Sequence, residues 1–260
     1  MITIKTPKKI YRHNPLGVKS TPMVQQDIPN NLNNDYKIAC ILDEFSYKSF
    51  QYESRFIQLD PDDWEETMLR EQPHFLFVES AWKGKELKWK NKIGGLHISQ
   101  DHTLRDLVNW CREHNMPTVF WNKEDPSNFD HFIEAAKYFD YIFTTDINSI
   151  PRYKEILGHD RVFVLMFAAQ PRLHNPINRD KEKIEKVAFA GTWYNQKHEN
   201  RRKDLQLLLT PALEYDVHIY DRMFEFKYKN YLFPDIYQPC IKGFLAYDEM
   251  IHTYKKYRVF

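Results

Sequence analysis

Short apolar runs alternate with segments of helical periodicity from about residue 36 onward, and this alternation limits the possible folds more than any other feature. The runs are short, bounded by turn residues and rich in β-branched or aromatic side chains, as buried strands are. They occupy residues 36–42, 55–59, 74–78, 117–121, 141–145 and 161–167. Strands that alternate with helices in this way form parallel sheets. The pattern therefore predicts an α/β fold with a Rossmann-like, doubly wound parallel sheet.

Two of the intervening segments have a clear helical pattern. Residues 103–114 carry apolar side chains at i, i+3, i+4 and i+7, with Asp101 as a candidate N-cap. A second helix is expected to start at Ser127, because Asp130 follows it at the spacing of a capping box.

Changes in composition divide the chain into four parts. Residues 1–34 are polar and rich in proline and asparagine, which predicts an extended arm. Residues 35–170 hold the first α/β domain, and 171–185, with two prolines and mixed charge, read as a linker. Residues 186–260 restart the strand and helix pattern but are few for a doubly wound domain. We therefore expect the start of a second, incomplete α/β domain.

Composition excludes several common classes of protein. The chain has only 7 glycines among 260 residues, and neither of the usual glycine-rich phosphate-loop motifs occurs. With 37 basic and 36 acidic residues, no overall field favours nucleic acid or an anionic membrane. A charged ligand would have to be met by local clusters.

The three cysteines are far apart and form no metal-binding or disulfide pattern, and the histidines form no zinc motif. We therefore expect no metal and no cofactor. No apolar segment approaches the length of a membrane span, and the first residues lack a signal-peptide core. The sequence predicts a cytoplasmic protein without a transmembrane segment, and leaves peripheral membrane contact open.

Polar side chains follow most of the predicted strands. The carboxyl ends of parallel strands meet at one edge of a sheet, where ligands bind. Aspartate and asparagine after a strand equally often cap the next helix, so each residue alone has a structural alternative. The loop that follows residue 121 holds more polar groups than one cap needs. Taken together, the strand-end candidates are Asp43, Glu79, Trp82, Asn122, Lys123, Glu124, Asp125, Thr144 and Asp146, with Gln170 just past the sixth strand.

A second group of candidates follows the strand that restarts the pattern at 186–191. Gly191 allows close approach of a ligand to the backbone, Thr192 follows it, and Arg201 and Arg202 lie at the start of the next helical segment. A positive helix start behind a strand suits a phosphate or diphosphate. The alternative is a solvated basic helix face.

Several motifs together resemble the CgeB-like glycosyltransferases, which are also described as spore-maturation or teichoic-acid-type sugar transferases. They are FVESAW (77–82), VFWNKEDP (119–126), FDYIFTTD (139–146), FAAQPRLHNPI (167–177) and VAFAGTWY (187–194). The resemblance covers residues 36 to 260. It implies a GT-B architecture, in which an acceptor-binding Rossmann-like domain faces a donor-binding one. Family members continue past residue 260, so we expect this chain alone to bind donor weakly and to turn over little.

The resemblance implies a glycosyltransferase that moves a sugar from a nucleotide-diphosphate donor to a cell-surface glycan, a teichoic-acid-type polymer or a protein. In that reaction a carboxylate takes the proton of the acceptor hydroxyl, and positive groups receive the leaving diphosphate. Asp43, Glu124 and Asp125 are the candidate bases, and the group at 191–202 is the candidate phosphate site. The remaining strand-end residues are candidates for substrate binding. The alternative is a non-catalytic module, derived from a truncated glycosyltransferase, that binds a glycan or a partner.

Overall fold

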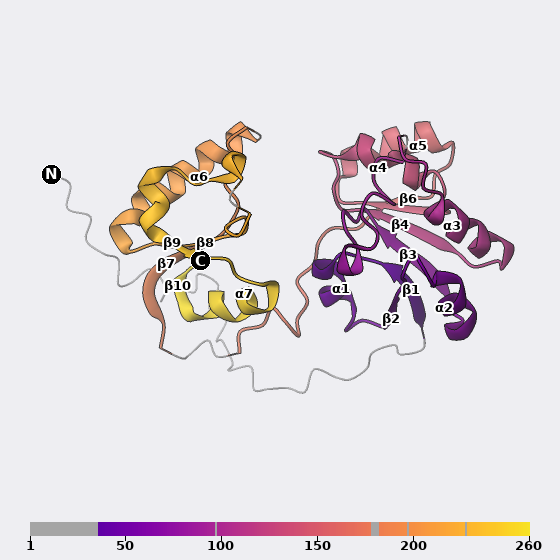
Figure 1. Ribbon diagram of the computed structural model, residues 1–260, viewed down its shortest axis with the longest axis horizontal. Helices are drawn as coiled ribbons and strands as arrows, with labels where there is room; N and C mark the ends of the chain where they lie inside the picture. Colours follow the sequence, from indigo (N-terminus) through magenta and orange to yellow (C-terminus); the bar gives the residue numbers. More distant parts are fainter. Residues whose placement is uncertain (1–35, 97, 178–181, 197, 227) are drawn as a thin grey trace, which may run out of the picture.

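The computed structural model describes residues 36–96, 98–177, 182–196, 198–226 and 228–260. The expected N-terminal arm lies outside these residues. Within them the chain forms two parallel sheets with helices (Figure 1). One sheet lies before the expected linker, and the other begins at Ile184, in the last two residues of the range expected to be linker.

The first sheet has six strands in the order β2-β1-β3-β4-β5-β6, and every pairing is parallel. The prediction of a Rossmann-like α/β fold with a parallel six-stranded sheet is therefore confirmed. The chain reverses its direction across the sheet between β1 and β3, which makes the carboxyl ends of these two strands the switch point. The strands are β1 Lys37–Ile41, β2 Arg55–Gln58, β3 Phe75–Glu79, β4 Thr118–Asn122, β5 Tyr141–Thr144 and β6 Val162–Val164.

The order of the strands decides which face each helix covers. Crossovers between parallel strands are right-handed, so the direction of a connection across the sheet decides the face on which its helix lies. The connection from β1 to β2 runs opposite to all the others, and its helix therefore lies on the other face. This helix is α1, whose Tyr47 and Phe50 pack on the face that contains Phe77 and Trp121. The other four helices bury their apolar stripes on the other face. The helices are α1 Glu44–Phe50, α2 Trp64–Glu71, α3 Thr103–Glu113, α4 Phe129–Ala136 and α5 Ile150–Leu157.

Two predicted helix starts differ from the structure by one or two residues. Asp101 accepts a hydrogen bond from the backbone N–H of Thr103 (2.9 Å), but His102 occupies the N-cap position of α3. Asn128, and not Ser127, precedes α4, because Pro126 lies in a turn that delays the helix. The apolar stripes themselves are buried as the periodicity predicted.

The second sheet has four parallel strands in the order β10-β7-β8-β9. Here the direction reverses between β7 and β10, so the carboxyl end of β7 is the switch point of this sheet. The strands are β7 Ile184–Gly191, β8 His218–Asp221, β9 Ile241–Gly243 and β10 Tyr257–Val259, and the helices are α6 Glu199–Ala212 and α7 Tyr247–Thr253. A core under α6 contains the buried rings of Trp193, Phe233 and Tyr237.

Contacts between α1 and α7 join the two units. Lys48 forms ion pairs with Glu44 of its own helix (2.6 Å) and with Asp248 of α7 (2.7 Å). The ring of Phe45 packs edge to face against Tyr247 at 5.1 Å between centroids. Figure 1 shows α1 and α7 on the sides of the two units that face each other. Among the described helices, none is long and apolar enough to cross a bilayer.

Candidate functional site

Three charged side chains meet at the switch point of the first sheet, and we call Asp43, Glu79 and Lys123 the switch-point cluster. Asp43 follows β1, Glu79 ends β3, and Lys123 follows β4. The ammonium of Lys123 lies 3.1 Å from Asp43 Oδ2 and 2.9 Å from Glu79 Oε1. The backbone N–H of Asp43 also donates to Glu79 Oε1 (2.5 Å). Residues 80 positions apart in sequence thus tie the ends of three neighbouring strands together.

Asp43 is held by the loop that follows β3. Its carboxylate accepts hydrogen bonds from the backbone N–H groups of Trp82 (3.2 Å), Lys83 (3.1 Å) and Gly84 (2.8 Å). Burial would raise the pKa of Asp43, but Lys123 and the backbone donors outweigh it, so the pKa lies below the usual value. An ionised carboxylate with this many donors is a poor proton acceptor. We therefore assign Asp43 to positioning the 82–84 loop and not to catalysis.

Glu79 is fully buried beneath Asp43 and Lys123. Burial raises its pKa, and Lys123 offsets this only in part. Burial also acts to lower the pKa of Lys123, but the two carboxylates outweigh it and raise the pKa. The lysine therefore stays positively charged, which excludes it as a neutral nucleophile.

Asp125 lies in a second network, with Asn122, Thr144 and Tyr153. Asn122 donates to Asp125 Oδ1 (2.8 Å), while Thr144 (2.6 Å) and the Tyr153 hydroxyl (3.0 Å) donate to Oδ2. Burial raises the pKa of Asp125 to about 6, although the bonds from Thr144 and Tyr153 act against the shift. Because both oxygens are occupied by donors of the same chain, this carboxyl fixes the loop after β4.

Replacing Asp125 with asparagine is expected to change how stability depends on pH. In the wild type the folded state keeps its proton up to about pH 6, whereas the unfolded chain loses it near 3.8, so stability falls as the pH rises between these values. The amide of asparagine does not titrate, so the variant does not lose stability in this way as the pH rises. Relative to wild type, the variant should gain about 1–2 kcal/mol between pH 4 and pH 7.5, because water screens part of the effect at this half-buried carboxyl. Urea unfolding at both pH values checks this.

The matched control is the exposed Asp62, whose replacement by asparagine should leave the pH dependence unchanged. Equal pH profiles of the Asp125→Asn variant and the wild type would contradict the raised pKa of Asp125.

Glu124 differs from the other two candidate bases. Its Oε2 accepts a hydrogen bond from Asn128 (3.0 Å), and its backbone N–H is held by Asn122 Oδ1 (3.1 Å). No donor to Oε1 occurs within the described residues. Glu124 is therefore the candidate carboxylate with an oxygen available to a substrate.

Two further candidates have structural partners. Asp146 follows β5 and caps the short turn 147–149, where it accepts from the backbone of Asn148 (3.2 Å) and from the Ser149 hydroxyl (2.8 Å). Gln170 lies at the end of α1 opposite to Asp43, where its amide donates to Ser49 O (2.8 Å). Asp146 therefore lies at the carboxyl edge of the first sheet, as predicted from the sequence, whereas Gln170 lies away from this edge.

The carboxyl end of β7 positions the second group of candidates. Thr192 is buried, whereas Arg201 in the first turn of α6 is exposed, with its guanidinium 5.4 Å from the ring centroid of Tyr194. Arg202 is engaged by backbone oxygens, at 3.1 Å from Tyr194 O and 2.6 Å from Asn195 O. Arg202 therefore braces the turn after β7, and Arg201 remains the residue able to meet an anion.

The sequence did not point to two features of these edges. Tyr153 of α5 completes the Asp125 network, although a tyrosine within an amphipathic helix gives no sign of such a role. Exposed rings also gather after β8 and β9, where Phe226 and Tyr228 stack at 5.7 Å and Phe244 is 43% exposed. The interleaving of aromatic and basic residues in 222–231 is a signal that could have indicated this surface.

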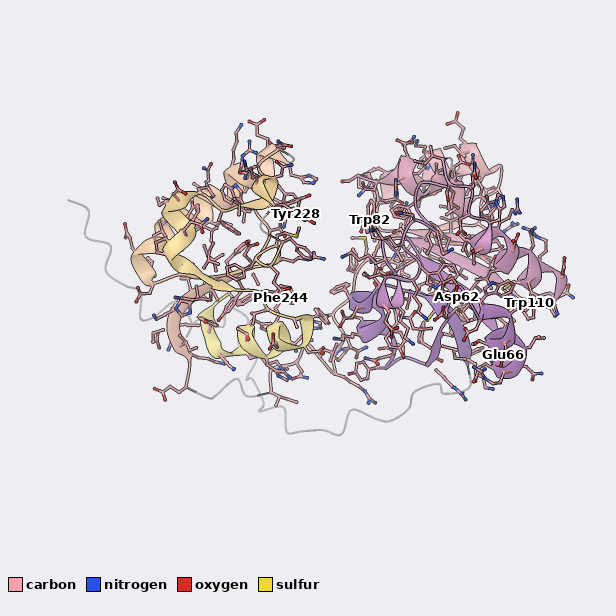
Figure 2. All side chains as sticks on the ribbon, in the orientation of Figure 1. Asp62, Glu66, Trp82, Trp110, Tyr228 and Phe244 are labelled. Carbon is pink, nitrogen blue, oxygen red and sulfur yellow. The ribbon has the colours of Figure 1, made fainter. Side chains whose placement is uncertain are left out.

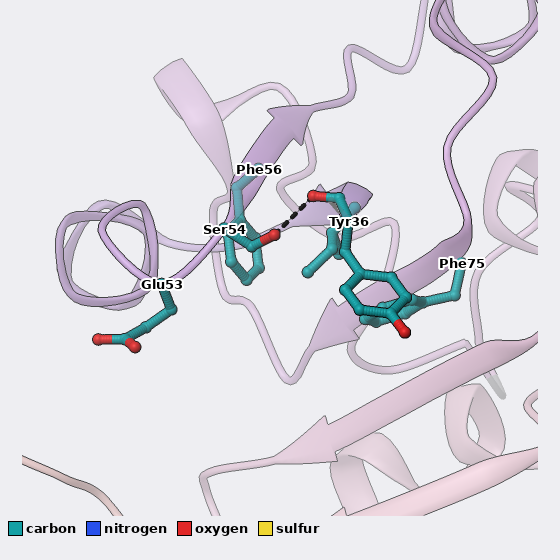
Figure 3. A pocket seen from close by; sticks show the side chains of 6 residues that line it. Tyr36, Glu53, Ser54, Phe56 and Phe75 are labelled. Atoms are coloured by element: carbon teal, nitrogen blue, oxygen red, sulfur yellow. Dashed lines mark hydrogen bonds between the residues drawn. The ribbon is translucent and has the colours of Figure 1, made fainter. Parts of the chain in front are cut away.

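An apolar hollow of about 300 Å³ lies at the opposite end of the first sheet (Figure 3). Tyr36, Ile38, Phe56 and Phe75 line it, and all of them stand at the amino ends of β1, β2 and β3. Glu53 and Ser54 complete the lining, and the Ser54 hydroxyl donates to the backbone oxygen of Tyr36.

The described residues contain no group of three or more histidine, cysteine or acidic side chains that could hold a metal ion. The fold is that of a Rossmann-like α/β protein, with polar and ionisable groups at the carboxyl ends of the strands in two parallel sheets. Comparison with known protein families and with curated protein sequences gives no significant match. The resemblance to CgeB-like glycosyltransferases therefore stays a prediction.

Proposed function

We propose that this chain is a glycosyltransferase of the GT-B type, which moves a sugar from a nucleotide-diphosphate donor to a cell-surface glycan, a teichoic-acid-type polymer or a protein. One observation carries the proposal. The two parallel sheets each have a switch point with polar groups, and Figure 2 places Trp82 of the first unit opposite Tyr228 and Phe244 of the second. Carboxyl-end edges are where open α/β sheets bind ligands.

On the donor side, the diphosphate would meet the start of α6. A helix of 14 residues has a positive N-terminal dipole, and Arg201 adds an exposed cation beside it. Gly191 is the last residue of β7, and a side chain there would collide with the ring of Phe189, at 2.6 Å from Cζ. The absence of a side chain at Gly191 therefore leaves room for the Phe189 ring at the end of β7.

On the acceptor side, Glu124 is the proposed base. Its open oxygen could take the proton of the attacking hydroxyl as the bond to the sugar forms and the bond to the diphosphate breaks. The switch-point cluster and the Asp125 network hold the loops on either side of it. Asn122 and Thr144 belong to that scaffold, because their side chains bond to Asp125.

A cytoplasmic location belongs to the same proposal, since nucleotide sugars are cytoplasmic metabolites. All three cysteines are free thiols, and Cys40 and Cys111 are buried, which is compatible with a reducing compartment.

The second candidate is a non-catalytic module that binds a glycan or a partner. It is favoured by the finding that Asp43 and Asp125 are both saturated by donors of the chain itself. A binding module needs fixed loops but no free base.

Calorimetric titration with UDP-glucose, UDP-N-acetylglucosamine and GDP-mannose tests the donor site. We expect Arg201→Ala to weaken binding of the donor by about tenfold, because a charge-assisted contact with the diphosphate is lost. The control is Arg105→Ala, an exposed arginine of α3 in the first unit. Equal affinities of the Arg201→Ala variant and the wild type, or no binding of any donor, would count against the proposal.

A further inference from the structure

Trp82 is unusual among the tryptophans because its ring is exposed at the carboxyl edge of the first sheet. Its exposed fraction is 41%, whereas Trp89 and Trp193 are fully buried. Figure 2 shows it on the side of the first unit that faces the second. An exposed indole ring offers a flat apolar face against which a ligand can pack.

The ring is held in one orientation from several sides. The backbone N–H of Trp82 bonds to Asp43, and its ring stacks on His131 at 4.8 Å with an interplanar angle of 22°. The edge of Phe132 packs against it at 5.2 Å. A ring fixed in this way loses little conformational entropy when a ligand binds.

His131 is itself fixed by the 94–95 turn. A side chain at Gly94 would come within 2.4 Å of His131 Nε2, so the backbone passes directly against the imidazole. The N–H of Gly95 donates to His131 O (2.8 Å). The stacked pair is therefore built into the fold.

An open hollow of about 460 Å³ borders the stack, because His131 is one of its lining residues. The others are Ile133 and two acidic residues, Asp130 and Glu134. Asp130 pairs with Arg152 through Oδ1, and Glu134 pairs with Lys137 through Oε1. The second oxygen of each carboxylate is left to accept hydrogen bonds, and the two cations balance the two carboxylates, so this surface has no net positive charge to attract a phosphate.

We propose that Trp82, His131 and this acidic hollow form a binding site for a neutral sugar ring. The apolar face of a pyranose would lie on the rings, and its hydroxyls would donate to Asp130 and Glu134. This inference rests on the proposed function, because the sugar bound at Trp82 would be the acceptor of that reaction. The acceptor would then be a neutral carbohydrate. A nucleotide fits the site poorly because the paired charges offer its phosphates no net positive charge.

The test is saturation-transfer NMR on the full chain with methyl β-glucoside, methyl β-galactoside and methyl N-acetyl-β-glucosaminide as probes. The ring protons of at least one glycoside should receive saturation from the wild type. Trp82→Ala should lower the affinity for that glycoside about tenfold, and Trp82→Phe should retain much of it. The control Tyr215→Ala removes a ring that is 51% exposed in the second unit and should change nothing.

Glu134→Gln is the second variant, because it keeps the ring stack and replaces only a carboxylate acceptor. It should weaken binding about threefold or more, since hydrogen bonds to a charged acceptor are the stronger ones. No saturation transfer from the wild type, or equal affinities in the wild type, Trp82→Ala and Glu134→Gln, would overturn the sugar site.

A parallel titration with UDP separates this inference from the proposed function. Binding of UDP without any glycoside would overturn the sugar site and leave the transferase proposal standing. Trp82-dependent binding of a glycoside without UDP would support the sugar site and favour the binding module over the transferase.

Discussion

Replacing Lys123 with methionine is expected to lower the free energy of unfolding by about 3–5 kcal/mol near neutral pH. The substitution keeps the volume of the aliphatic stem but leaves Glu79 buried without its cation, and removes one partner of Asp43. An uncompensated buried carboxylate is among the most destabilising changes in a protein core. Urea unfolding monitored by circular dichroism gives the value.

The pH dependence and a double variant identify the cause. Burial raises the pKa of Glu79 above its usual value, so Glu79 takes up a proton as the pH falls while Asp43, whose pKa is lowered, stays ionised. The cost of Lys123→Met that comes from the unpaired Glu79 should therefore shrink as the pH falls toward 4. Adding Glu79→Gln removes the orphaned charge and should restore about 2 kcal/mol or more. The exposed Lys137 is the control, and its replacement by methionine should cost less than about 0.5 kcal/mol. A cost that is independent of pH would contradict the electrostatic explanation.

The Glu124→Gln variant is expected to transfer sugar at about one hundredth of the wild-type rate or below. Its stability should stay close to that of the wild type. Glu124 is the candidate base with an open oxygen, and the amide keeps the side chain's shape but accepts no proton. Release of nucleoside diphosphate in the presence of acceptor measures the rate, and thermal unfolding measures stability.

Two comparisons sharpen this test. Asp43→Asn should chiefly lower stability, because Asp43 holds the 82–84 loop through three backbone bonds. Glu113→Gln, at an exposed position near the end of α3, should change neither rate nor stability. Full activity of Glu124→Gln would show that another group takes the proton.

The sequence predicted the first sheet well because strand and helix periodicity report burial directly. The runs at 74–78 and 117–121 appear as β3 and β4, each shifted by one residue. Each strand ends on a polar residue, Glu79 or Asn122, which the apolar pattern did not include. The residue types after the strands were also informative, and Glu79 and Lys123 do meet at the switch point. The sheet order itself could not be read from the sequence, because periodicity does not say which strands pair.

The roles of the candidate residues were less predictable. Asp43, Asp125 and Glu124 look alike in sequence, but two of them are saturated by donors that only the tertiary fold brings near. Lys83 and Gly84 lie 40 and 41 positions from Asp43, and Tyr153 lies 28 positions from Asp125. Local patterns do not reveal such partners, so sequence reasoning treated the three carboxylates as equivalent.

The most direct test of a nucleotide-sugar site at the facing carboxyl ends is amide hydrogen exchange with and without a saturating sugar nucleotide. We predict slower exchange at 191–196 and 198–203 and in the loops after β3 and β4, while exchange in the amino-end hollow near Tyr36 and Phe75 is unchanged. Protection confined to that hollow, or no protection with any donor, would contradict it.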